Sequence, residues 1–282
     1  MPFQVPIDEA SRLYPEYDFV RPLTPSEQKA AFHVRDKEGN DLCLKMIAPS
    51  YDLDRLNREI RALQTIRHPN VVRLVEYTYS STPEKQVHHI IEEFVEGSDL
   101  TDPLNTGPWT TERASEFFAA LSDGLAALDD EEVVHRDLKP SNIRVRNDGS
   151  PVIIDFGLAR HLTMTDLTKT EHGARIGTPL YFSPEQFEGT KYDIDHRTDL
   201  FAVGVLMYEA LVGYHPFWRD GMSFDDLSLA VRESTAQFDT PEFLALPPNW
   251  QLLIKRLLEK SRERRPNRAS QVATMLRKLG GA

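Results

Sequence analysis

Short apolar runs separated by polar turns make the first hundred residues strand-rich. Residues 30–36 and 41–47 flank the turn-like sequence Lys-Glu-Gly-Asn, so this pair predicts a hairpin. Residues 71–79 and 88–95 are rich in β-branched and aromatic side chains, which predicts two further strands. The N-terminal part of the chain is therefore expected to form a small sheet.

One helix is expected between these strands. Residues 52–66 carry apolar side chains at helical spacing, and the sequence His-Pro-Asn that follows is typical of a helix end. The apolar positions are Leu53, Leu56, Ile60 and Leu63.

After residue 100 the pattern becomes mainly helical. Thr110 or Thr111 is the expected N-cap of an amphipathic helix that runs to residue 130. Residues 199–213 are almost entirely apolar, which predicts a buried central helix. Residues 143–157 predict a short hairpin that turns at residues 147–149. Two further helices are expected at residues 249–261 and 269–279.

These elements predict an α+β fold with two lobes. The smaller N-terminal lobe contains an antiparallel sheet and one key helix, and the larger C-terminal lobe is mainly helical. Residues 96–99, Glu-Gly-Ser-Asp, are the expected hinge.

Composition narrows the functional classes. The formal net charge of −11 argues against non-specific binding to nucleic acid or to anionic membranes. The sequence contains no apolar run long enough to span a membrane, and residues 1–18 do not resemble a signal peptide. Cys43 is the single cysteine, which excludes an intrachain disulfide. A cytoplasmic protein is expected.

The strongest chemical signal is the sequence His-Arg-Asp-Leu-Lys-Pro-Ser-Asn at residues 135–142, with Asp-Phe-Gly at residues 155–157. Phosphoryl transfer requires a group that orients the attacking hydroxyl, and Asp137 has that chemistry. Lys139 can neutralise charge on the transferring phosphoryl group. Asn142 and Asp155 carry the oxygen ligands that Mg²⁺ prefers.

These motifs resemble the eukaryotic-type (Hanks-type) serine/threonine protein kinases over nearly the whole chain. The resemblance implies one kinase domain over residues 1–282 that uses ATP and Mg²⁺. Within it, the expected parts are an N-terminal extension (1–16), an N-lobe (17–95), the hinge (96–99) and a C-lobe (100–282). The sequence Ser-Pro-Glu-Gln at residues 183–186 is reminiscent of bacterial members of the family.

The resemblance also implies a nucleotide site. Lys45 matches the lysine that pairs with the phosphates, and Glu59 matches the glutamate that pairs with that lysine. The other implied nucleotide-binding residues are Ala31, Cys43, Glu93, Val95 and Arg144.

Further motifs imply scaffold and docking roles. Residues 177–186 resemble the substrate-docking segment, with Thr178 at the docking position, which implies a protein substrate. Glu185 is expected to pair with Arg265, and Asp199 is expected to anchor the catalytic loop. Lys139 and Thr178 resemble the serine/threonine branch of the family.

The activation segment, residues 155–185, is expected to carry regulatory phosphates. Arg136 precedes the catalytic aspartate and often receives such a phosphate in the family. The candidate acceptors are Thr163, Thr165, Thr168 and Thr170, of which the last two are best placed. The alternative is that this segment is a polar loop whose threonines are not modified. The family also makes a homodimer for autophosphorylation in trans one option.

The phosphate-gripping loop departs from the family pattern. Its three glycines become Thr24, Ser26 and Lys29, and Pro25 removes an N–H donor. We expect weaker nucleotide binding rather than none. Lys29 either supplies a replacement cation to the phosphates or is simply solvated.

Two charged residues also lie where the family has apolar ones. Arg144 takes the position beneath the adenine, and Glu92 takes the gatekeeper position behind it. A buried lone charge is costly, so the two either pair with each other or pair with Glu59 and Lys45 respectively. Arg144 could also stack on a base. Capture of Lys45 by Glu92 would leave the nucleotide-free protein inactive.

Three functions are compatible with these residues. An active serine/threonine protein kinase agrees with the intact Lys45, Asp137, Asn142 and Asp155. A catalytically weak pseudokinase that acts as a nucleotide sensor or interaction scaffold agrees with the missing glycines. A kinase-fold enzyme with another donor nucleotide or chemistry agrees with Glu92 and Arg144.

Overall fold

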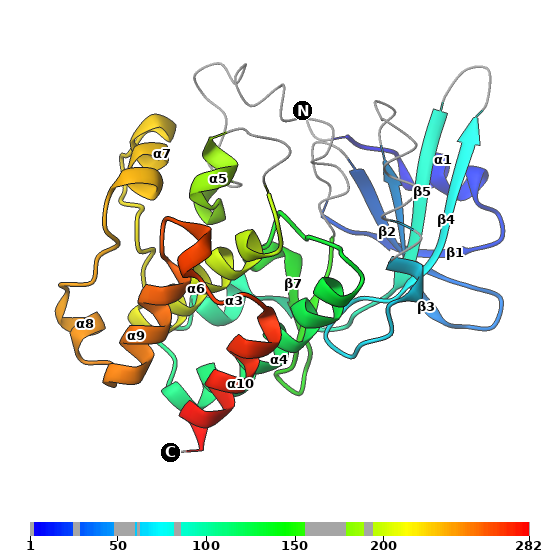
Figure 1. Ribbon diagram of the computed structural model, residues 1–282. Coiled ribbons are helices and arrows are strands. Elements are labelled where there is room, and N and C mark those ends of the chain that lie inside the picture. The colour runs from blue at the N-terminus through cyan, green and yellow to red at the C-terminus, as the bar shows by residue number, and fades with distance from the viewer. Residues whose placement is uncertain are drawn as a thin grey trace. The chain divides into compact units, whose positions relative to one another are not determined.

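The computed structural model describes residues 3–24, 29–47, 60, 63–81, 86–155, 179–188 and 194–281. The chain divides into two compact units (Figure 1). The first comprises Met1–His68 and Val72–Val95, and the second comprises Pro69–Val71 and Glu96–Ala282. Each unit is described by itself.

The first unit is built on a five-stranded antiparallel sheet in the order β1-β2-β3-β5-β4. The predicted hairpin is confirmed, because β2 pairs with β3 from Lys29↔Ile47 to Arg35↔Asp41. The strands are β1 (Asp18–Pro22), β2 (Lys29–Arg35), β3 (Asp41–Ile47), β4 (Leu74–Ser81) and β5 (Gln86–Glu93).

The expected start of β4 at residue 71 is wrong by three residues. Val71 instead forms a parallel bridge with Ile153 of the second unit. Asn70 strengthens that attachment by donating its side-chain N–H to the Pro151 carbonyl at 2.7 Å. Residues 70 and 71 therefore bond to the second unit, and β4 begins only after them.

A short helix, α1 (Ile7–Leu13), packs on one face of this sheet. Ala10 and Tyr14 join a buried apolar cluster with alternate residues of the strands, among them Phe32, Leu44 and Ile91. The Tyr14 hydroxyl also hydrogen-bonds the His89 ring at 2.9 Å. The N-terminal extension is thus part of the core of the first unit.

The second unit is mainly helical. A small sheet, β6-β7-β8, accompanies the helices, and the predicted hairpin is confirmed with its turn at residues 147–149. Its strands are β6 (Ser98–Asp99), β7 (Ile143–Val145) and β8 (Pro151–Ile153), and the α-helices are α3 (Thr101–Leu104), α4 (Thr111–Asp130), α5 (Pro184–Phe187), α6 (Arg197–Val212), α7 (Phe224–Glu233), α8 (Pro241–Leu244), α9 (Pro248–Leu257) and α10 (Ala269–Gly280).

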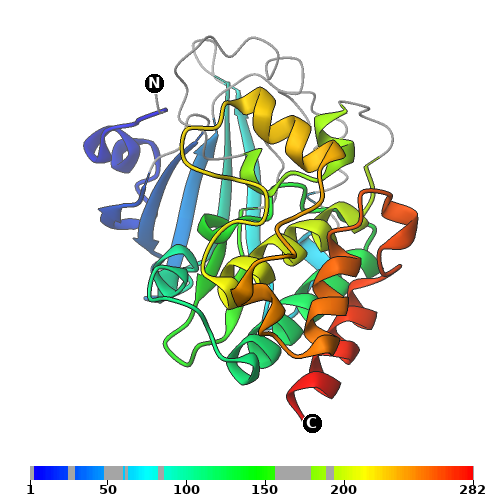
Figure 2. The same ribbon diagram turned by 90° about the vertical axis from the view of Figure 1, so that its left-hand side faces the viewer.

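Helix α6 forms the centre of the second unit. It is buried on all sides, as its nearly uniform apolar sequence predicts. Gly204 permits close contact with α9, because a Cβ at this position would lie 2.7 Å from Cβ of Leu257. Helix α10 lies beside α4 (Figure 2). Thr110 is the N-cap of α4 and accepts a hydrogen bond from the Arg113 N–H.

The two units together confirm the predicted α+β class. The expected hinge, residues 96–99, lies in the second unit, and its last two residues form β6. Short 3₁₀ turns, η1 (Pro140–Asn142), η4 (Pro179–Tyr181) and η5 (Arg262–Arg264), complete the second unit. No helix within the described ranges is long and apolar enough to cross a membrane.

Candidate active site

In the second unit, the loop at residues 135–139 is anchored by two buried side chains. The Asp199 carboxylate, on α6, accepts the backbone N–H groups of His135 and Arg136, each at 2.8 Å. This confirms the predicted anchor. Burial raises the pKa of Asp199 to about 7, while the two N–H donors act in the opposite direction. Gln186 adds a second hold by donating to the Arg136 carbonyl at 2.8 Å.

His135 fixes the loop from inside. Its buried ring donates from Nε2 to the Ile154 carbonyl at 3.0 Å and accepts the Asp137 N–H at Nδ1, at 3.3 Å. The bond accepted at Nδ1 requires the neutral ring, and burial lowers the pKa of His135. One side chain therefore connects the catalytic loop to the strand end that carries Asp155.

The backbone is strained at two points of this site. Arg136 has φ 62° and Asp155 has φ 57°, in the left-handed region that side chains other than glycine seldom adopt. Such conformations persist only where surrounding bonds hold them, as Asp199 and Gln186 do at Arg136.

Asp137, Lys139 and Asn142 converge on one carboxylate. Lys139 Nζ lies 2.9 Å from Oδ2 of Asp137, and the Asn142 amide donates to the same oxygen at 3.0 Å. Asn142 also donates to the Asp137 carbonyl at 2.8 Å. One carboxylate oxygen of Asp137 is thus the acceptor for both side chains.

Asn142 and Asp155 fit a hard divalent cation. The Ile154 N–H donates to the Asn142 carbonyl at 2.9 Å, which ties the residue before Asp155 to Asn142. Because the amide nitrogen of Asn142 is occupied by Asp137, its side-chain oxygen is the atom suited to a metal. Among the described residues, no group of three or more His, Cys, Asp or Glu side chains could hold a metal ion. Mg²⁺ commonly takes one or two protein ligands and fills the rest with phosphate and water.

The predicted pair between Glu185 and Arg265 is confirmed. The Arg265 guanidinium is fully buried and contacts both carboxylate oxygens, at 2.7 and 2.8 Å. Burial tends to raise the pKa of Glu185, but the bond and charge of Arg265 outweigh it and lower the pKa. This pair fixes α5, at the end of the segment that is expected to dock the substrate.

In the first unit, three of the residues expected to touch the nucleotide, Ala31, Cys43 and Lys45, share the face of the sheet opposite α1. We call it the lysine face. It comprises Ala31, His33, Cys43, Lys45, Ile90 and Glu92. The strand register places Ala31, Lys45 and Ile90 in one row, and it places His33, Cys43 and Glu92 in the next. All six are at least 92% buried.

Lys45 forms an ion pair with Glu92. The two side chains are 8% and 5% exposed. Lys45 is thus one of the two partners that the sequence left open for Glu92. Glu59, the other expected partner of Lys45, lies outside the described residues.

The last residue of β5, Glu93, and Val95 just after the strand are the two remaining candidates of the first unit. Glu93 donates its backbone N–H to the Arg73 carbonyl at 3.0 Å, and its carboxylate accepts the Arg73 N–H at 3.2 Å. Val95 is buried at the end of the first unit. Phe94 lies between these two residues in the sequence. The His33 ring stacks on the Phe94 ring, with centroids 3.9 Å apart.

Arg144 has partners that the sequence did not suggest. Glu59, one of its expected partners, lies outside the described residues. The Arg144 guanidinium binds Asp99 at 2.8 Å and the Gly97 carbonyl. The reason is strand pairing, since Asp99 of β6 lies directly opposite Arg144 of β7. Gly97 permits this approach, because a Cβ there would lie 2.0 Å from the Val145 carbonyl oxygen.

Several expected residues lie outside the described ranges: Pro25, Ser26, Glu59, Thr163, Thr165, Thr168, Thr170 and Thr178. Lys29 is the first residue of β2. The sequence pattern gave no role to His33, placed Asp99 only in the expected hinge, and placed Gln186 only in the expected docking segment. Asp99 was detectable only through the pairing of β6 with β7.

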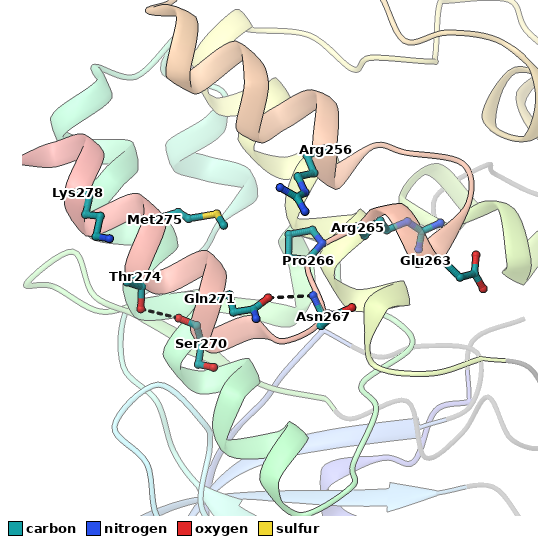
Figure 3. Close-up of a pocket in the computed structure, with 10 residues that line it drawn as sticks. All are labelled: Arg256, Glu263, Arg265, Pro266, Asn267, Ser270, Gln271, Thr274, Met275 and Lys278. Atoms are coloured by element: carbon teal, nitrogen blue, oxygen red, sulfur yellow. Dashed lines mark hydrogen bonds between the residues drawn. The ribbon is translucent and has the colours of Figure 1, made fainter.

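A separate hollow of about 530 Å³ lies beside α10 (Figure 3). Its lining includes Arg256, Lys278 and Met275, with the ion-paired Arg265 at one side. None of the residues expected to bind nucleotide or metal contributes to it, so it is not the candidate site.

Comparison with known proteins gives a consistent result. The family described as protein kinase domain matches residues 29–276. The serine/threonine-protein kinase pkn2 of Myxococcus xanthus is 36% identical over 230 residues, covering 79% of this chain and 27% of that protein. The serine/threonine-protein kinase PknB of Mycolicibacterium smegmatis is 35% identical over 173 residues, covering 61% and 27% respectively.

A plant protein matches a similar stretch. CBL-interacting protein kinase 1 of Oryza sativa subsp. japonica is 34% identical over 228 residues, covering 79% of this chain and 46% of that protein. The chain spans less than half the length of each of these relatives.

Proposed function

We propose a catalytic function from one premise: the chain belongs to the protein kinase family. It is homologous to serine/threonine protein kinases, and the family generally uses ATP and a divalent metal ion. Our proposal is that this chain itself transfers the γ-phosphate of ATP to serine or threonine hydroxyls of proteins.

The arrangement around Asp137 carries the proposal. Asp137 accepts the proton of the attacking hydroxyl, and Asn142 keeps its carboxylate oriented for that task. Lys139, held 2.9 Å from the same carboxylate, is placed to neutralise charge that develops on the transferring phosphoryl group. The strained loop is fixed in advance by Asp199, so little reorganisation is needed during the reaction.

The remaining residues bind the nucleotide and metal. Asn142 and Asp155 would supply the protein oxygens for Mg²⁺, which when bound would neutralise phosphate charge. Lys45 pairs with the phosphates. Ala31 and Cys43 provide apolar contact to the adenine, and Arg144 has the position that the family pattern assigns beneath it. The backbones of Glu93 and Val95 supply its hydrogen-bonding edge.

Regulation by phosphorylation is part of the proposal. Thr168 and Thr170 are the first acceptor candidates, ahead of Thr163 and Thr165. Arg136 receives the phosphate, and a homodimer is the arrangement for transfer in trans. Thr178 contributes to docking of the protein substrate.

A second candidate function has one specific observation in its favour. The buried pair of Lys45 with Glu92 occupies the lysine that phosphates require. A pseudokinase that binds nucleotide weakly and acts as a sensor or scaffold would tolerate such a pair permanently.

Intact mass spectrometry separates the two candidates. The protein, first treated with a phosphatase, is incubated with ATP and Mg²⁺ beside a generic protein substrate. We expect added phosphate on the wild type, none with Asp137→Asn, and wild-type behaviour for Asp148→Asn, an exposed aspartate in the β7–β8 turn. No transfer to either acceptor by the wild type would overturn the proposed kinase activity and favour the scaffold function.

A further inference from the structure

The Lys45–Glu92 pair lies inside a sheet rather than at a surface. Glu92 lies opposite Cys43 in the strand register, one row along the lysine face from Lys45. The two side chains meet diagonally across β3 and β5. Neighbouring Glu93 cannot replace Glu92, because successive residues of a strand point to opposite faces.

A buried ion pair of this kind is stable only while both partners are present. Lys45 carries one charge, and the Glu92 carboxylate and a nucleotide phosphate are both anions that require it. Strong binding of Lys45 to a phosphate therefore weakens its bond to Glu92. When no nucleotide is bound, no phosphate competes for Lys45, and the lysine pairs with Glu92.

We propose that Glu92 is a latch on Lys45, which holds the lysine in the nucleotide-free protein and is displaced by nucleotide phosphate. The inference rests on the proposed function, because it takes Lys45 as the phosphate-binding lysine. It adds a role for Glu92, which is to set the concentration of phosphate-bearing ligand that is needed to occupy this site.

The latch has a measurable consequence. If the site accepts phosphates only when Lys45 is released, the apparent dissociation constant rises in proportion to the closed fraction. A latched state that holds nine molecules in ten would weaken binding about tenfold. Adenosine carries no phosphate, so its affinity should not depend on the latch.

Isothermal titration calorimetry with Mg-ADP and with adenosine tests this difference. Glu92→Gln keeps the size of the side chain and removes its charge. We expect its affinity for ADP to rise about tenfold while that for adenosine stays within about twofold of wild type. Glu76→Gln is the matched control, because it removes an exposed carboxylate from β4 of the same sheet. It should leave both affinities unchanged.

Two further variants keep the test decisive. Glu92→Met should reproduce the gain for ADP if Glu92→Gln folds poorly, as judged by circular dichroism. Lys45→Met combined with either substitution should abolish the gain, because the latch then has nothing to release.

The contrary outcomes are distinguishable. Equal ADP affinity for the wild type and both Glu92 variants would overturn the latch and leave the kinase proposal standing. An equal gain for ADP and adenosine would show that Glu92 acts through the shape of the pocket instead. No ADP binding by any of the proteins would overturn the latch together with the nucleotide site of the proposed function.

Discussion

The two units each contain a buried ion pair, but the pairs are built differently. In the second unit, Arg265 contacts Glu185 through two parallel hydrogen bonds and also donates to the carbonyls of Arg197, Glu259 and Lys260. In the first unit, the ammonium of Lys45 forms an ion pair with the carboxylate of Glu92.

This difference agrees with the chemistry of the two cations. A guanidinium has five donors in a rigid fork, so it can be satisfied completely and permanently by fixed acceptors. An ammonium is a compact charge on a flexible stem and exchanges partners more readily. The comparison teaches that burial alone does not distinguish a scaffold pair from a functional one.

Breaking the Glu185–Arg265 pair, which we call the scaffold pair, should have the largest effect on stability. Glu185→Gln leaves the fully buried Arg265 without its carboxylate, and we expect a loss of about 3–5 kcal/mol in the free energy of unfolding. Urea denaturation measures the loss. A change below about 1 kcal/mol would show that the backbone carbonyls alone satisfy Arg265.

His215 should make the second unit sensitive to acid. Its buried ring accepts the Trp218 N–H at 2.9 Å and donates to the Leu180 carbonyl at 2.8 Å, so folding requires the neutral form. Burial lowers the pKa of His215 to about 4, below the ordinary value of about 6.5.

Stability from His215 is therefore complete above about pH 6.5 and is lost as the pH falls towards 4. We expect this residue to contribute roughly 3 kcal/mol to the decline. The free energy of unfolding of His215→Gln, measured from pH 7.5 to 4, should decline less steeply than that of the wild type. Parallel curves would contradict the assignment.

Breaking the Lys45–Glu92 pair should lower the free energy of unfolding by less than breaking the scaffold pair. We expect Glu92→Gln to lower the free energy of unfolding by about 1–2 kcal/mol, because Lys45 can redirect its ammonium. The measurement uses the same urea titration as Glu185→Gln. A loss as large as that of Glu185→Gln would mean that Lys45 is as fixed as Arg265.

The smallest expected effect lies on the other face of the same sheet. Tyr14→Phe removes the hydroxyl that bonds His89 and keeps the ring in its apolar cluster. We expect a loss of about 1 kcal/mol in thermal denaturation. Tyr17→Phe, which changes a partly buried tyrosine packed beside that cluster, is the comparison variant.

Much of the fold could be predicted because its signals are local. The uniform apolar run of α6 and the Asn-Asp-Gly turn before β8 identify their elements directly. The pairing of Glu185 with Arg265 followed from family motifs rather than from any spacing rule, since the two residues lie 80 positions apart.

The remainder depends on contacts that single-sequence patterns do not contain. Helix α1 spans 7 residues after Pro6, too few for a clear helical period, and it is stabilised by packing on the sheet. Arg144 pairs with Asp99 because two short strands lie side by side. Neither interaction leaves a local signal in the sequence.

The most direct test of the comparison is a crystal structure of the protein with Mg-ADP. We predict that Lys45 leaves Glu92 and contacts a phosphate oxygen, while the Arg265–Glu185 pair keeps its two hydrogen bonds. Bound Mg-ADP with Lys45 still paired to Glu92 would contradict the account, because the first-unit pair would then be as permanent as the second.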